Sequence, residues 1–280
     1  MGVGEGEGGS PGMGELLRAA AVRERVALVT GAGSPRGIGF AAAVRLAGWC
    51  RAVAVTATGA RIRLRAAELE GRGAQIQALT CDLTDPAATD ELIAAVVERF
   101  GRLDILVANA GIAAEGETLA ASSFAQQPLV DFERGLRVNL GTAVHSLRAV
   151  LPVMLAQGYG RIVVVSSVTG PLVTNVGDSA YATAKAALTG LVRTVAVETA
   201  ACGITANCIL PGWIATDSSS AQELRAGAHT PVGRPGTADE VAAAVEFLAT
   251  RDAAYITGAE LVVDGGNILQ EDKAAAARRP

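Results

Sequence analysis

The feature that most limits the fold of this 280-residue chain is a regular alternation of short apolar runs with longer Ala- and Leu-rich segments. Continuous short apolar runs are typical of strands that are buried on both faces of a parallel sheet. The alternation extends from Val26 to Val263 without a Pro-, Gly- or Ser-rich linker. It therefore predicts one α/β domain of the doubly wound Rossmann type, with a seven-stranded parallel sheet and helices on both faces.

The boundaries of the expected elements follow from these runs. Strands are expected at Val26–Thr30, Ala52–Thr56, Ile76–Thr80, Asp104–Ala108, Arg161–Ser166, Ile204–Leu210 and Glu260–Val263. The clearest helices are expected at Gly37–Ala47, Pro86–Phe100, Val130–Ala156, Ser179–Ala201 and Ala238–Ala249. We expect residues 1–20 to form a weakly ordered lead-in, residues 21–269 to form the domain, and residues 270–280 to form a tail. The Gly-rich start also lacks the basic and apolar regions of a signal peptide.

Composition excludes several classes of partner. A formal net charge of -4 and the absence of a dense Lys/Arg run argue against a nucleic-acid surface. No apolar run approaches the roughly 20 residues that span a bilayer, so no membrane partner is expected. The cysteines, Cys50, Cys81, Cys202 and Cys208, have no C-x-x-C spacing and no nearby His, which predicts neither a metal site nor a disulfide framework. A reducing cytoplasm fits this usage best.

A glycine-rich turn joins the first expected strand to the first expected helix. It reads Val-Thr-Gly-Ala-Gly-Ser-Pro-Arg-Gly-Ile-Gly over residues 29–39. Glycines allow the backbone to turn sharply and to approach a pyrophosphate, which then lies at the N-terminus of the helix. Many glycine clusters are only turns, but the position of this one between a strand and a helix predicts a dinucleotide site.

Tyr181 and Lys185 are the most informative candidates for chemistry. They lie four residues apart on an expected helix, so their side chains share one face. A nearby ammonium favours the phenolate, and it would lower the phenol pKa from about 10 toward the range useful for proton transfer. A Tyr and a Lys four residues apart often occur by chance, so the pair indicates a catalytic site only together with other motifs of the chain.

Further motifs occur in a fixed order along the chain. They are Thr30-Gly31 with Gly37-Ile38-Gly39, Asp82-Leu83, Asn109-Ala110-Gly111, Asn139, Ser167-Val-Thr-Gly170, Tyr181 with Lys185, and Pro211-Gly212-Trp-Ile214-Ala-Thr216. Each alone has an ordinary structural explanation, such as a cap or a turn. Together they resemble the short-chain dehydrogenase/reductase family from about Val26 to Gly266. The glycine turn departs from the family pattern T-G-x-x-x-G-x-G by two extra residues, although Gly33 would preserve the G-x-x-x-G-x-G interval.

The resemblance implies hydride transfer between a nicotinamide and a carbonyl or secondary alcohol carbon, with no metal. Its catalytic residues would be Asn139, Ser167, Tyr181 and Lys185. Tyr181 would supply the proton and Ser167 would hydrogen-bond the reacting oxygen. Lys185 would lower the Tyr pKa and hold the nicotinamide ribose, while Asn139 would support a water-linked proton path. Ser166 competes with Ser167, but the family pattern Ser-x-x-Gly favours Ser167.

The choice of cofactor depends on the end of the second strand. No acid follows it, whereas an acid there would hydrogen-bond a ribose 2′-OH and repel a 2′-phosphate. Arg36 resembles the basic residue of NADP-preferring relatives, with Thr58 and Arg61 as further phosphate contacts. NADP(H) is therefore preferred and NAD(H) remains possible; alternatively, Arg36 points to solvent from the lengthened loop. The predicted cofactor contacts are Gly31, Gly33, Ser34, Arg36, Gly37, Ile38, Gly39, Thr58, Asp82, Leu83, Asn109, Ala110, Gly111, Tyr181, Lys185, Pro211, Gly212, Ile214 and Thr216.

Three functions stay open at this point. The first is an NADP(H)-dependent carbonyl reductase similar to the 3-oxoacyl-thioester reductases, and the second is an NAD-linked polyol or sugar dehydrogenase. The third is a dinucleotide-sensing protein without turnover, which the presence of every catalytic side chain disfavours. A small-molecule substrate would border the Ile112–Gln127 loop and the Trp213–Pro235 segment. Ala-rich faces at Ala143–Ala156 and Ala182–Val195 also suit a homo-oligomer, a dimer or tetramer, or ordinary core packing.

Overall fold

The computed structural model describes residues 24–111 and 123–271. The predicted lead-in and nearly all of the predicted tail lie outside the described residues, as does most of the Ile112–Gln127 loop. The described chain contains a seven-stranded sheet in the order β3-β2-β1-β4-β5-β6-β9, and every pairing in it is parallel. The predicted α/β fold class is confirmed.

The strands match the apolar runs of the sequence closely. Their bounds are β1 Val26–Thr30, β2 Ala52–Ala57, β3 Gln75–Thr80, β4 Ile105–Ala108, β5 Gly160–Val165, β6 Ile204–Pro211 and β9 Glu260–Val263. Strand β1 pairs with β2 on one side and β4 on the other, so the chain reverses its direction of travel across the sheet between them. Ligands of open α/β sheets bind beyond the carboxyl ends of the strands at such a switch point.

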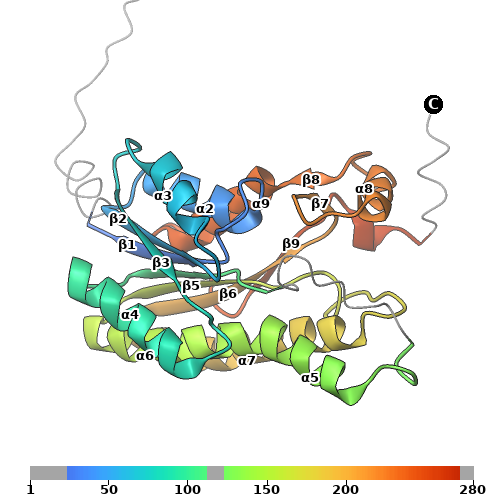
Figure 1. Cartoon of the computed structure of the whole chain (residues 1–280), viewed down its shortest axis with the longest axis horizontal. Helices are drawn as coiled ribbons and strands as arrows, with labels where there is room; N and C mark the ends of the chain where they lie inside the picture. Colours follow the sequence, from blue (N-terminus) through green and yellow to red (C-terminus); the bar gives the residue numbers. More distant parts are fainter. Residues whose placement is uncertain (1–23, 112–122, 272–280) are drawn as a thin grey trace, which may run out of the picture.

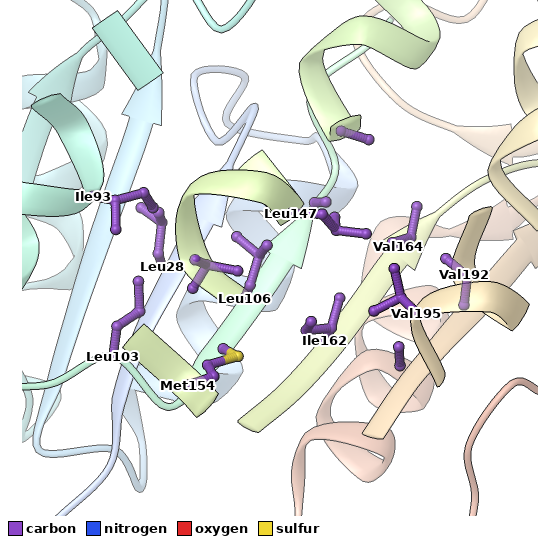
Figure 2. Packing of buried hydrophobic residues seen from close by; sticks show 14 of the residues in the cluster. Leu28, Ile93, Leu103, Leu106, Leu147, Met154, Ile162, Val164, Val192 and Val195 are labelled. Atoms are coloured by element: carbon purple, nitrogen blue, oxygen red, sulfur yellow. The ribbon is translucent and has the colours of Figure 1, made fainter. Parts of the chain in front are cut away.

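Helices cover both faces of this sheet, as Figure 1 shows. One face carries α2 Ile38–Ala47, α3 Ile62–Leu69 and α9 Ala238–Ala249, and the other carries α4 Pro86–Phe100, α5 Leu129–Leu136, α6 Thr142–Gln157 and α7 Ser179–Thr199. Each face has its own apolar cluster. Figure 2 shows the second of these layers, where Leu106 and Ile162 of the sheet meet Leu147 and Met154 of α6. Burying this surface fixes the helices over the sheet and positions the loops at its edges.

The residues at the helix ends explain where the helices begin and stop. The Asp85 side chain accepts the Ala87 N–H at 2.9 Å, Pro86 occupies the first turn of α4, and Gly101 ends the helix in a left-handed conformation. Thr237 and Glu240 form a reciprocal capping box at the start of α9. These are the capping patterns that satisfy the free backbone groups at helix ends.

The helix predicted at Val130–Ala156 is continuous, but it is not α-helical throughout. A five-residue π-helical turn, Arg137–Gly141, separates α5 from α6. Such a turn widens the helix by one residue and is rare in α-helices, where it commonly accompanies a functional position. Asn139 lies within it. Apolar periodicity does not reveal such a turn, because the residues on either side keep helical spacing.

A small assembly that the sequence did not predict lies beyond the carboxyl edge of the sheet (Figure 1). Strands β7 Ile214–Ala215 and β8 Gly236–Thr237 form a two-stranded parallel sheet, and helix α8 Ala221–Ala228 connects them along the chain. We call residues 212–237 the α8 segment. A capping box of Ser220 and Glu223 starts its helix, and the Ser219 hydroxyl donates to the Ile214 carbonyl at 2.7 Å. The segment is therefore organised by its own hydrogen bonds.

One helical stretch, Leu129–Gln157, is long and apolar enough to cross a membrane by length and composition alone. Five charged residues interrupt the stretch, so it is not the continuous apolar run that the sequence analysis considered: Asp131, Glu133, Arg134, Arg137 and Arg148. In addition, α6 within this stretch packs against α4 and against strands β4 and β5. Helices that cover a sheet need the same apolar content, so we read the stretch as part of the core.

Candidate active site

The loop after β5 presents two adjacent serines in different directions. The Ser166 hydroxyl donates to the Lys185 carbonyl at 2.8 Å and is buried. The Ser167 oxygen instead accepts the Thr169 N–H at 3.0 Å. Gly170 has a φ of 108°, and a side chain on it would lie 2.3 Å from the Ala182 carbonyl oxygen. Only glycine permits this close approach, which holds the Ser167 loop against α7.

Tyr181 lies in the first turn of α7 and meets Ser167 through a side-chain hydrogen bond. Burial raises the pKa of the Tyr181 phenol, and the charges of Asp178 and Glu223 raise it further. The hydrogen bond from Ser167 acts in the opposite direction, because it stabilises the phenolate. The phenol is thus protonated at neutral pH and is placed as a proton donor.

Lys185 lies one turn further along α7 and is 4% exposed. Its ammonium donates to the Val165 carbonyl at 3.0 Å and lies 5.6 Å from the centre of the Tyr181 ring. Burial lowers the pKa of Lys185 to about 8. The expected lowering of the Tyr181 pKa by this lysine is not seen in this structure: burial is the largest effect and raises this pKa, and Lys185 is not among the groups that shift it.

Asn139 reaches the same region from the π-helical turn. It is 3% exposed, and its amide donates to the Gly135 carbonyl at 3.2 Å. A side chain on Gly111, after β4, would lie 3.2 Å from the Asn139 amide oxygen and 3.6 Å from the Lys185 ammonium. Asn139 and Lys185 therefore flank the same glycine. The structure brings all four predicted catalytic residues to the carboxyl ends of β4 and β5.

The glycine turn after β1 is braced by Asn109. Gly31 has a φ of 67°, and the Asn109 amide donates to the Thr30 and Gly31 carbonyls at 3.2 and 3.1 Å. The Thr30 hydroxyl oxygen accepts the N–H groups of Asn109 and Ala110, each at 3.0 Å. The Asn109 side chain thus shapes the turn.

The start of α2 has the character of an anion site. Gly37 precedes the helix in an extended conformation, and no side chain caps it. The free N–H groups of a helix start and its dipole favour a pyrophosphate at this position. The residues present fit a dinucleotide.

The far end of the predicted cofactor site lies over β2 and β3. Thr58 follows β2, and Arg61 lies next to Gly33, where an added side chain would meet the Arg61 Nε atom at 3.3 Å. The Asp82 carboxylate accepts the N–H and hydroxyl of Thr84 at 2.9 and 2.8 Å, which forms a turn. Leu83 is 4% exposed beside it. The predicted adenosine contacts are therefore gathered at one end of the sheet.

Asp217 is the residue of this region that the sequence analysis missed. Its carboxylate accepts the Ser34 hydroxyl at 2.6 Å, the Arg36 N–H at 3.1 Å and the Arg36 guanidinium at 2.5 Å. Arg36, predicted as a phosphate contact with a solvent-facing side chain as the alternative, pairs with this acid, and its side chain is 78% exposed. The hydrogen bonds lower the pKa of Asp217 to about 2. No local signal marks Asp217, because its partners lie more than 180 residues away.

The remaining predicted cofactor contacts lie at the base of the α8 segment. Pro211 ends β6, Gly212 follows it, and Ile214 begins β7. The Thr216 N–H donates to the Ser219 hydroxyl oxygen at 3.0 Å. These residues border the same carboxyl edge as Ser167 and Lys185.

Comparisons with known proteins agree with this architecture. The family model described as "Enoyl-(Acyl carrier protein) reductase" matches residues 31–267. The chain is 38% identical over 246 residues to 3-oxoacyl-[acyl-carrier-protein] reductase FabG of Escherichia coli, covering 86% of this chain and 96% of that protein. It is 38% identical over 256 residues to the short-chain reductase protein NovJ of Streptomyces niveus, covering 87% of this chain and 94% of that protein.

A solved structure supports the same assignment. A short-chain dehydrogenase/reductase mutant from Serratia marcescens matches with a TM-score of 0.79 and 33% identity, over 88% of this chain and 99% of that chain. The chain therefore belongs to the short-chain dehydrogenase/reductase family of oxidoreductases and resembles its 3-oxoacyl reductases.

Proposed function

We propose that this protein reduces a carbonyl group to a secondary alcohol with NADPH, and that the carbonyl belongs to a 3-oxoacyl thioester or a similar ketone. The observation that carries the proposal is the hydrogen bond between Ser167 and Tyr181, one helical turn from the buried Lys185. The name of FabG supports the substrate class.

Each catalytic side chain has a role that its surroundings permit. A bound nicotinamide would supply the hydride. The Tyr181 hydroxyl, which burial keeps protonated, donates its proton to the carbonyl oxygen as negative charge develops there. The Ser167 hydroxyl, whose oxygen is fixed by the Thr169 N–H, donates a hydrogen bond to the same oxygen. The Lys185 ammonium adds positive charge nearby, and Asn139 supports the path by which Tyr181 regains a proton.

The residues at the end of β2 and in the glycine turn favour NADP(H). Thr58 and Arg61 follow β2 without an acid, and Arg61 lies against the turn at Gly33. Arg36 supplies a second guanidinium at the same edge. Two guanidiniums near a ribose suit a 2′-phosphate, since Arg forms strong hydrogen bonds with phosphate oxygens.

We further propose a homo-oligomer in the cytoplasm. Leu129 and Val130 on α5 and Val197 on α7 are well exposed, and the two helices pack together on one face of the molecule. Cys50, Cys81 and Cys208 are buried free thiols, which suits a reducing compartment.

The test measures oxidation of NADPH and of NADH against a ketone, an aldehyde and a 3-oxoacyl thioester. We expect turnover with the thioester and NADPH, with kcat/KM for NADPH at least about tenfold above that for NADH. Oxidation of polyols with NAD⁺ as the main activity would instead identify the dehydrogenase alternative. Binding of NADPH without turnover on the whole panel would contradict the reductase.

A further inference from the structure

The lengthened glycine turn has a partner in the α8 segment. Ser34 and Pro35 lengthen the turn beyond the family pattern, and Ser34 is one of the residues that holds Asp217. Arg36, next to the insertion, contributes both its backbone N–H and its guanidinium. Two segments 181 residues apart are therefore joined at the edge where the cofactor is proposed to bind.

The donors that hold Asp217 are those that a phosphate uses. A hydroxyl, a backbone N–H and a guanidinium converge on one carboxylate, with distances from 2.5 to 3.1 Å. Charge-assisted bonds of this type serve phosphate at least as well as carboxylate, because a phosphate monoester carries about two negative charges and more acceptor oxygens. The carboxylate is an anion provided by the chain itself.

The Arg36–Asp217 pair is also exposed enough for a phosphate to replace the carboxylate. The Arg36 side chain is 78% exposed and the Asp217 side chain is 30% exposed, so neither is a buried charge that needs this particular partner. Exposed ion pairs contribute little to stability in general, so a competing dianion can replace the carboxylate. Asp217 remains ionised at any neutral pH, since its pKa is held near 2 by Ser34 and Arg36.

We propose that Asp217 competes with the 2′-phosphate of NADP(H) for Ser34 and Arg36, so that this acid sets how strongly the protein prefers the phosphorylated cofactor. The inference rests on the proposed cofactor and assigns a specificity role to an acid outside β2. When the phosphate takes its place, the α8 segment loses its tie to the glycine turn while keeping its internal capping box and the Ser219–Ile214 hydrogen bond. Binding at the adenosine end is thus coupled to the segment that borders the substrate.

The experiment measures dissociation constants of NADPH and NADH by fluorescence titration for wild type and Asp217→Asn. We expect NADPH to bind about threefold to tenfold more tightly to the variant, since one opposing charge is removed. NADH, which lacks the phosphate, should change by less than about twofold. Unchanged or weaker NADPH binding would overturn the proposal. Asp239→Asn is the matched control, because it removes the same charge from an exposed pair with Arg45 elsewhere on the surface.

Two further measurements separate this inference from the cofactor proposal and from folding effects. Adenosine 2′,5′-bisphosphate and AMP probe the adenosine end alone, and only the bisphosphate should bind more tightly to Asp217→Asn. In an Arg36→Ala background, Asp217→Asn should give a smaller gain for NADPH, because the Ser34 hydroxyl is then the one side-chain donor that the substitution releases. If Arg36→Ala leaves the NADPH to NADH affinity ratio unchanged, the assignment of Arg36 to the phosphate fails. If Arg36→Ala lowers this affinity ratio while Asp217→Asn does not tighten NADPH binding in the wild-type background, the cofactor proposal stands and only the competition by Asp217 is contradicted.

Discussion

Charged groups are buried at both ends of the strands of the central sheet, but their partners differ. We call the ends where the strands begin the amino edge and the ends where they finish the carboxyl edge. At the amino edge, Asp104 precedes β4 and is fully buried. It accepts Arg25 at 2.8 Å, Arg102 at 2.6 Å and the Val26 N–H at 2.9 Å. At the carboxyl edge, the ammonium of Lys185 is nearly as buried but donates to the neutral carbonyl of Val165.

A tyrosine at each of the two edges shows the same difference in partners. Tyr159, before β5, stacks between two cations, with Arg25 at 3.6 Å and Arg161 at 4.5 Å from its ring centre. The Tyr181 hydroxyl instead meets the neutral hydroxyl of Ser167. The amino edge pairs its buried carboxylate with two arginines, whereas burial at the carboxyl edge lowers the pKa of a lysine to about 8. Such shifts are typical of sites that carry out proton chemistry.

The largest effect is expected from removing one phenolic oxygen at each edge. Tyr181→Phe should lower kcat for carbonyl reduction by about 10³-fold, because it removes the proposed proton donor. Tyr159→Phe keeps the ring that stacks with Arg25 and Arg161, so its kcat should stay within about twofold of wild type. Steady-state kinetics with NADPH and a 3-oxoacyl thioester check both. Comparable losses in the two variants would break the contrast between the edges.

The second effect tests stability at the amino edge. Asp104→Asn leaves Arg25 and Arg102 without their carboxylate, and we expect a loss of about 3 kcal/mol in the free energy of unfolding. Urea denaturation measures it. Asp239→Asn, in an exposed pair with Arg45, should lose less than about 1 kcal/mol. If Asp104→Asn is equally mild, the buried ion pair does not stabilise the protein as argued.

The third prediction follows from the pKa of Lys185. Burial lowers this pKa from 10.5 to about 8. Between these values the unfolded chain binds a proton that the folded protein does not, so stability rises with pH across the window. Below about pH 8 both states carry the proton, and the contribution no longer changes.

Lys185→Met isolates this contribution, because it removes the titrating group and keeps an apolar stem. From pH 8 to pH 10.5, wild type should gain up to about 3 kcal/mol relative to the variant. Urea denaturation of both proteins at a series of pH values measures the difference. Parallel stability curves would show that the lysine keeps its ordinary pKa in the folded protein.

The sequence predicts the sheet well because each strand is a local apolar run. All seven strands of the main sheet lie where these runs predict them, including β9 at Glu260–Val263 without error. Strands β7 and β8 have two residues each, too few for any periodicity, and α8 has eight residues, of which only Gly227 is buried. Their places depend on contacts between distant segments.

The candidate site likewise has a part that local spacing predicts and a part that depends on contacts between distant segments. The positions of Ser167, Tyr181 and Lys185 follow from a strand end and one helix, so local spacing brings them together. The pairing of Asp217 with Arg36 joins residues 181 positions apart, and spacing carries no information about it. The direction of the Tyr181 pKa shift depends on burial, which only the packed structure determines.

The smallest effects compare adjacent serines. Ser167→Ala should lower kcat by about 10²-fold, because it removes a donor to the developing charge on the substrate oxygen. Ser166→Ala removes the bond to the Lys185 carbonyl at 2.8 Å and should cost about 1 kcal/mol of stability with kcat nearly unchanged. Steady-state kinetics and urea denaturation of the two variants measure both quantities. A reversed result, with Ser166→Ala impairing kcat and Ser167→Ala only stability, would assign the contact with the reacting oxygen to the other serine.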